Sequence, residues 1–251
     1  MGTKEKTVWF CTNCGNESPK WMGRCPACGE WNTMAEQTLV TGKPSRNSSI
    51  SSSAPASGNR PLHLKDIDAS AENRLSLGLT EVDRLLGGGI VKGSLVLIGG
   101  EPGIGKSTLS LQIPLGSPGL KTLYVSGEES ARQVKMRADR LGGDNSNCFI
   151  FSETDINNII AQADALKPDL MVVDSVQTMF SPNVDSSAGS VTQIKEVTAI
   201  LLHFAKMSGI PVILIGHITK DGYIAGPKIL EHIVDVVLQF EGDNKGSYRL
   251  L

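Results

Sequence analysis

The chain has 251 residues, of which 40% are hydrophobic and 20% charged, a composition typical of a soluble globular protein. Its formal net charge of −2 excludes a protein that holds nucleic acid through a strong overall positive field, so any DNA contact has to come from a local patch. The apolar runs fall short of the roughly 18 residues that span a bilayer, and the N-terminus lacks the apolar core of a signal peptide. We therefore expect a cytoplasmic protein.

Composition divides the chain into three segments. Residues 1–34 contain four of the five cysteines and all three tryptophans. Residues 35–61 are rich in serine, proline and glycine and carry few large apolar side chains, which predicts a flexible linker. From residue 62 to 251, short apolar runs alternate with stretches of helical periodicity, which predicts one large domain.

The paired cysteines of the first segment predict a metal site. Cys11 and Cys14 form one C-x₂-C pair, Cys25 and Cys28 form another, and a glycine follows each pair. Four thiolates make the closed tetrahedral shell of a structural Zn²⁺ site, and a reducing compartment disfavours the alternative of disulfides. We expect this small module to lack a stable core without its metal.

The tryptophans of the same segment leave two interpretations open. Trp9, Trp21 and Trp31 would supply the core of so small a module, which is the interpretation we favour. Alternatively, their rings would stack on nucleic-acid bases.

The large segment predicts an α/β fold. Continuous apolar strands that alternate with amphipathic helices favour a mostly parallel sheet covered by helices on both faces. The predicted helices are residues 131–141, 156–166 and 191–208. The predicted strands are residues 94–99, 122–126, 148–151, 169–174, 211–216 and 234–241.

A phosphate-binding loop follows the first of these strands. "GEPGIGKS" at residues 100–107 matches G-x-x-x-x-G-K-[ST] in full, between a buried strand and a helix, which argues against a mere glycine-rich turn. Backbone N–H groups and the helix N-terminus would hold phosphates, Lys106 would reach the β- and γ-phosphates, and Ser107 would hold Mg²⁺. The candidate nucleotide-binding residues are Gly100, Glu101, Pro102, Gly103, Ile104, Gly105, Lys106, Ser107 and Thr108.

Three further strand ends carry polar side chains. Asp174 is a candidate Mg²⁺ carboxylate, or a helix cap. Glu128 and Glu129 offer a carboxylate that polarises the attacking water, or two acids that stabilise the next helix. His217 is a candidate sensor of the γ-phosphate, or a structural histidine.

Pro114 interrupts the helix that should follow the phosphate loop. It stands eight residues after Lys106, and "GSPG" follows at residues 116–119. Proline lacks the N–H that continues the helical hydrogen-bond ladder. The sequence therefore predicts a helix that ends at Ile113, about 12 Å long, and a nucleotide site supported by two helical turns.

Together these motifs resemble a known group of proteins. "LGLTEVDRLLGGGIVKGSLVLIGGEPGIGKST" is similar to the RecA superfamily of ring- and filament-forming ATPases. "CTNCG", "SPKWMGRCPACGEWNT", "YVSGEES" and "GHITKDGYIAGPKILEHIVDVVLQFEG" narrow the resemblance to one family of bacterial DNA repair and recombination proteins with an N-terminal C4 zinc finger. The resemblance covers nearly the whole chain outside the linker.

That resemblance implies a function and its residues. The family acts as hexameric, DNA-dependent ATPases, helicases that drive branch migration beside a RecA-type recombinase, with ATP, Mg²⁺ and Zn²⁺ as cofactors and single-stranded or branched DNA as partner. Glu128 takes the position of the catalytic glutamate, Asp174 that of the Mg²⁺ acid and His217 that of the γ-phosphate sensor. Lys220 and Lys228 fall in a loop that lines the DNA channel, although both would also suit plain solvent exposure.

One departure from the family keeps a second function open. The chain stops at "SYRLL", where the family continues with a Lys-Asn-Arg-Phe-Gly motif and a Lon-protease-like domain that supports hexamer assembly. The alternative is therefore an ATP- and zinc-binding interaction module that is defective in turnover or ring assembly. The zinc module disfavours a third possibility, a RecA-like ATPase that acts on protein.

Overall fold

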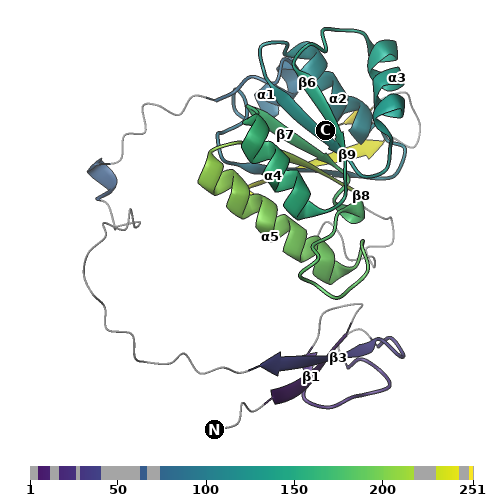
Figure 1. Ribbon diagram of the computed structural model, residues 1–251. Helices are drawn as coiled ribbons and strands as arrows, with labels where there is room; N and C mark the ends of the chain where they lie inside the picture. Colours follow the sequence, from purple (N-terminus) through teal and green to yellow (C-terminus); the bar gives the residue numbers. More distant parts are fainter. Residues whose placement is uncertain are drawn as a thin grey trace. The chain divides into compact units, whose positions relative to one another are not determined.

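The computed structural model divides the chain into two compact units, the second of which extends from residue 73 to the C-terminus (Figure 1). The structure describes residues 5–11, 17–26, 29–40, 63–66, 74–217, 230–242 and 249–250.

The first unit is a small antiparallel sheet. Its strands are β1 (Glu5–Cys11), β2 (Glu17–Ser18) and β3 (Met34–Val40), in the order β2-β1-β3. In the register of β1 and β3, Cys11 lies opposite Met34. Residues 35–40 thus pair with β1, although we predicted that the linker begins at residue 35; the β-branched residues Thr38 and Val40 favour a strand at this end of the segment. Residues 41–61 of that predicted linker lie outside the described part.

The second unit contains a sheet of seven described strands, in the order β10-β9-β4-β8-β7-β5-β6. All six apolar runs predicted as strands form strands here, and all six run parallel, as predicted for an α/β fold. Only β10 is antiparallel. The strands are β4 (Leu95–Gly100), β5 (Thr122–Ser126), β6 (Cys148–Ser152), β7 (Leu170–Asp174), β8 (Val212–His217), β9 (Val236–Gly242) and β10 (Arg249–Leu250).

Three of the described helices begin directly after a side chain that caps them. Ser130 forms a capping box with Gln133, and Asp155 and Ser190 each accept a backbone N–H of the helix that follows. None of the helices in the described ranges combines the length and apolarity needed to cross a membrane. The helices are α1 (Thr80–Leu85), α2 (Lys106–Gly116), α3 (Ala131–Leu141), α4 (Ile156–Leu166) and α5 (Val191–Ser208), with short 3₁₀ turns at Leu64–Asp66 and Val176–Thr178.

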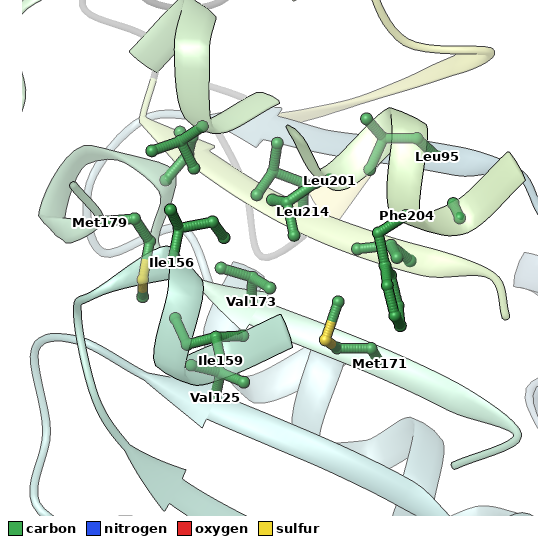
Figure 2. Packing of buried hydrophobic residues seen from close by; sticks show 14 of the residues in the cluster. Leu95, Val125, Ile156, Ile159, Met171, Val173, Met179, Leu201, Phe204 and Leu214 are labelled. Atoms are coloured by element: carbon green, nitrogen blue, oxygen red, sulfur yellow. The ribbon is translucent and has the colours of Figure 1, made fainter. Parts of the chain in front are cut away.

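Helices cover both faces of this sheet (Figure 1). Alternate residues of each strand point to opposite faces, so Leu97 packs with α4 and α5 while Ile98 packs with α1, α2 and α3. Figure 2 shows the first of these two clusters, where Leu201 and Phe204 of α5 lie over Leu214 and Met171 of the strands. Burial on both faces explains why the strands read as continuous apolar runs.

The predicted end of α2 at Ile113 was wrong. The helix continues through Pro114 and ends at Gly116. Ile113, Pro114 and Leu115 are all buried, and burying a large apolar side chain contributes about 1.5–3 kcal/mol. Proline inside a helix costs about 3 kcal/mol, so the packing of this last turn outweighs the hydrogen bond that Pro114 cannot make.

The C-terminal end of α2 also packs against a backbone that requires glycine. Gly78 has a φ of +69°, and a Cβ at this position would overlap the carbonyl oxygen of Gly116 and the hydroxyl of Ser117. Gly119, three residues beyond α2, has no atom within 4 Å of its Cβ position and no positive φ.

We predict that Gly78→Ala lowers the free energy of unfolding by about 2–3 kcal/mol, because the new methyl group combines left-handed strain with overlap. Gly119→Ala is the matched control and should change it by less than about 0.5 kcal/mol. Urea unfolding followed by circular dichroism measures both. Equal midpoints for the two variants would show that the contact between Gly78 and α2 is unimportant.

Candidate nucleotide-binding site

Strand register brings the candidate residues to one edge of the sheet. Gly100 of β4 pairs with His217 of β8, and Ser126 of β5 pairs with Asp174 of β7. Because these strands are parallel, their carboxyl ends meet at the same edge, where ligands of α/β sheets bind. The phosphate loop lies between β4 and α2, and Gly105 precedes the helix with a φ of +113° that favours glycine.

Lys106 is buried at the first position of α2. Its Nζ donates hydrogen bonds to the carbonyl oxygens of Gly100 and Glu101, at 2.8 and 2.9 Å. Burial lowers the pKa of this ammonium group, and the negative charges of Asp174 and Glu128 partly offset the effect. The lysine predicted to reach the β- and γ-phosphates therefore lies within the loop, close to two carboxylates.

A buried tyrosine holds Asp174 in place. Tyr124 Oη donates to Asp174 Oδ2 at 2.7 Å and lies 3.3 Å from Ser110 Oγ of α2. Burial and the adjacent carboxylate raise the pKa of Tyr124 well above its ordinary range, so the phenol keeps its proton. Sequence reasoning missed Tyr124. The available signal was a hydroxyl inside an apolar strand, since a buried hydroxyl needs a partner.

Glu128 faces the other candidate residues. Its Oε1 accepts a hydrogen bond from Ser175 Oγ at 2.5 Å and lies 3.2 Å from His217 Nε2. Burial raises the pKa of Glu128, but the hydrogen bonds from Ser175 and His217 and the charges of His217 and Lys106 outweigh it, so the pKa lies below its ordinary value. A carboxylate that stays ionised at neutral pH is able to accept a proton or orient a water molecule.

His217 is half-buried at the end of β8. Its Nε2 contacts Glu128. Its other ring nitrogen, Nδ1, is buried and has no hydrogen-bond partner within the described part of the chain. Its backbone carbonyl oxygen accepts a weak hydrogen bond from Gln177 Nε2 at 3.4 Å. A ring with one nitrogen on a carboxylate is suited to respond to a nearby phosphate.

Lys106, Glu128 and His217 line one pocket of about 490 Å³, within the range of small-molecule sites. Two arginines of α3, Arg137 and Arg140, also line it, and sequence reasoning missed them. Their i, i+3 spacing on an amphipathic helix is typical of a solvent face, so the signal was weak. The pocket is lined by Pro102, Gly103, Gly105, Lys106, Ser107, Thr108, Glu128, Arg137, Arg140 and His217.

Both side chains expected to hold Mg²⁺ have suitable chemistry. The Ser107 hydroxyl lines the pocket, and Asp174 is buried beside it with one oxygen, Oδ1, outside its hydrogen bond to Tyr124. Hydroxyl and carboxylate oxygens are the ligands that Mg²⁺ prefers.

Half of the predicted zinc ligands are described. Cys11 and Cys25 are buried, and backbone hydrogen bonds from Gly29 N to Cys25 O and from Cys25 N to Glu30 O close a tight turn around Cys25. Such a turn fits a thiolate knuckle, so the described part of the module is compatible with zinc. Cys14 and Cys28, like the predicted DNA contacts Lys220 and Lys228, lie outside the described residues.

The interpretation of the tryptophans as a core was wrong for two of them. Trp21 and Trp31 are 56% and 67% exposed, and both rings flank Gly23. The Arg24 guanidinium lies 5.9 Å from the Trp31 ring centre. Three short strands leave too little surface to cover both rings, so these tryptophans face solvent while Trp9 is half-buried.

Two known protein families match parts of the chain. Residues 58–223 match the AAA domain family, and residues 9–36 match the rubredoxin metal binding domain. The solved structure of the KaiC-like protein PH0186 from Pyrococcus horikoshii OT3 shares the fold, with a TM-score of 0.57 and 23% identity over 70% of this chain and 85% of that one.

Curated relatives align along almost the whole chain. "DNA repair protein RadA" of Bacillus subtilis is 48% identical over 250 residues, which are 99% of this chain and 54% of the relative. The protein of the same name from Chlamydia trachomatis is 49% identical over 253 residues, covering 100% of this chain and 54% of the relative. The chain thus spans about half the length of the curated relatives it matches.

The hydrogen bond from Ser175 to Glu128 predicts a specific pH dependence. A lowered pKa in the folded state stabilises the fold above the unfolded pKa, and this contribution disappears as the pH falls through the folded pKa. Ser175→Ala should therefore show its full loss of stability at pH 7. The loss should become smaller as the pH falls below 4.5, the ordinary pKa of glutamate.

Thermal unfolding from pH 7 to pH 3 measures this deficit, with Glu128→Gln as the background control. In that background, Ser175→Ala should show a deficit that does not vary with pH. A deficit that stays constant in the presence of Glu128 would mean that Ser175 acts through packing alone.

Proposed function

The chain belongs to the AAA domain family and is a homologue of the DNA repair protein RadA, and on this premise we propose that it is a DNA-dependent ATPase and helicase that promotes branch migration of recombination intermediates. The observation that carries the proposal is the convergence of Lys106, Glu128 and His217 on one pocket beside Asp174. A fold likeness alone would not support an activity. The position of an ionised carboxylate opposite a phosphate-loop lysine supports one.

Each residue has a distinct role in this proposal. The backbone N–H groups of residues 100–108 and the N-terminus of α2 bind the phosphates, and Lys106 exchanges its two carbonyl partners for phosphate oxygens. Glu128 accepts a proton from the attacking water. His217, in contact with Glu128, senses the γ-phosphate.

Ser107 and Asp174 would hold Mg²⁺, which neutralises charge that develops on the phosphates. Tyr124 orients Asp174 for this task, because its hydrogen bond fixes one carboxylate oxygen. Tyr124 therefore acts as a positioning residue behind the metal ligand.

Single-stranded or branched DNA is the proposed partner. Exposed Trp21 and Trp31, with Arg24 beside Trp31, offer rings for base stacking and a cation for phosphate. Lys220 and Lys228 are proposed to contact phosphates in the channel of a hexamer. A RecA-type recombinase would act alongside, which places the protein with the chromosome in the bacterial cytoplasm.

We predict ATP hydrolysis that single-stranded DNA stimulates and that Lys106→Ala abolishes. Glu128→Gln should retain ATP binding and lose turnover by about 100-fold or more, because general base catalysis contributes 10²–10⁴-fold. Phosphate release with and without DNA measures both variants. Nucleotide binding without turnover in the unaltered chain would instead favour an ATP- and zinc-binding interaction module.

We also predict one Zn²⁺ per chain, bound by Cys11, Cys14, Cys25 and Cys28. Replacing Cys25 with serine should release the metal, because a structural site needs all four ligands. Cys148→Ser is the control: this thiol lies in β6, and burial raises its pKa to about 11, so it is a poor metal ligand. Elemental analysis of the purified chain decides, and an absence of zinc would refute the site.

A further inference from the structure

Arg137 is placed between a carboxylate and the candidate nucleotide pocket. It lines the pocket and forms an ion pair with Glu129 through Nη2 and Oε1. The side chains of Arg137 and Glu129 are 19% and 30% exposed, so solvent screens this pair less than a pair on the open surface. Neither residue has a role in the function proposed above.

The backbones on both sides of this ion pair are fixed. Glu129 N donates to Ser126 Oγ at 3.1 Å, at the end of β5. Arg137 belongs to α3, whose Val134 and Ala138 are buried in the core. Any change of partner therefore requires only rotation of the two side chains, which occurs on the timescale of nucleotide binding.

Charge determines which partner Arg137 prefers. Without nucleotide, the pocket contains the cations Lys106, Arg137 and Arg140 against the single carboxylate of Glu128. Glu129 neutralises Arg137 in this state. A triphosphate carries more negative charge than Glu129. Each phosphate also presents pairs of oxygens that can accept two hydrogen bonds from the planar guanidinium group.

We propose that Arg137 binds the outer phosphates of ATP and that Glu129 competes with them for it. This inference rests on the proposed function, namely that the pocket binds ATP. Glu129 thereby weakens nucleotide binding and helps the pocket to release its ligand. The two neighbouring glutamates then have opposite effects. Glu128 acts on the attacking water, whereas Glu129 holds Arg137 away from the phosphates.

Titration with a fluorescent ATP analogue and Mg²⁺ tests the proposal through affinity. Arg137→Gln should weaken binding about tenfold, the lower end for charge-assisted hydrogen bonds. Glu129→Gln should tighten it several-fold, because Arg137 loses its competitor. The double variant should bind like Arg137→Gln, since Glu129 acts only through Arg137.

Arg132→Gln is the matched control, because Arg132 is exposed on the same helix and does not line the pocket. It should leave affinity unchanged. If Arg137→Gln fails to fold, Glu129→Gln still tests the competition, and Arg137→Lys should bind with intermediate affinity because it keeps the charge without the fork.

The opposite signs separate this proposal from a structural role. If the pair only anchored α3, both single variants would lower the melting temperature and neither would change affinity, which would overturn the proposal. Affinity that Lys106→Ala leaves intact would refute the proposed nucleotide site itself. Binding that depends on Lys106 but not on Arg137 or Glu129 would refute this inference alone.

Discussion

The parallel pairing of β4, β8, β7 and β5 is the constraint on which the candidate site depends. It places Gly100 beside His217 and Ser126 beside Asp174, so residues that are far apart along the chain meet at one edge of the sheet. The sheet holds this register because both of its faces are buried, and a slip by one residue would exchange the core of α4 and α5 for that of α1, α2 and α3. Packing far from the pocket thus fixes the distances within it.

The electrostatics of the edge follow from that register. A buried ammonium group is costly unless it is paired and hydrogen-bonded, and Lys106 is supplied with two carbonyl oxygens and two nearby carboxylates. Glu128 is only partly desolvated, and Ser175, His217 and Lys106 together hold its pKa below the ordinary value. Lys106 therefore already has partners within the site, and an anion that reaches it replaces existing hydrogen bonds.

Local signals made most of the fold predictable. The predicted bounds of α3, α4 and α5 coincide with the observed ones, because Ser130, Asp155 and Ser190 cap the helices directly before the apolar periodicity begins. The phosphate loop was predictable for a similar reason, since its chemistry lies in consecutive residues. Tyr124 and Ser175 were not, because their contacts arise from the pairing of strands that are distant in the sequence. Arg137 was not, because its position at the pocket depends on how α3 packs. Pro114 misled because a propensity rule ignores the packing of the turn that contains it.

The contrast between Glu128 and Glu129 shows how such pairing assigns chemistry. The two residues are adjacent and chemically identical, and the sequence alone left their roles undecided. Just beyond β5 their side chains diverge. Glu128 contacts Ser175, which follows β7, and His217 at the end of β8, whereas Glu129 contacts Arg137 of α3. The partners on the β7 and β8 side hold a proton acceptor at the pocket. On the α3 side, Arg137 makes Glu129 a group that competes with the nucleotide. Two adjacent glutamates are thus suited to different tasks, one to catalysis and the other to release of the ligand.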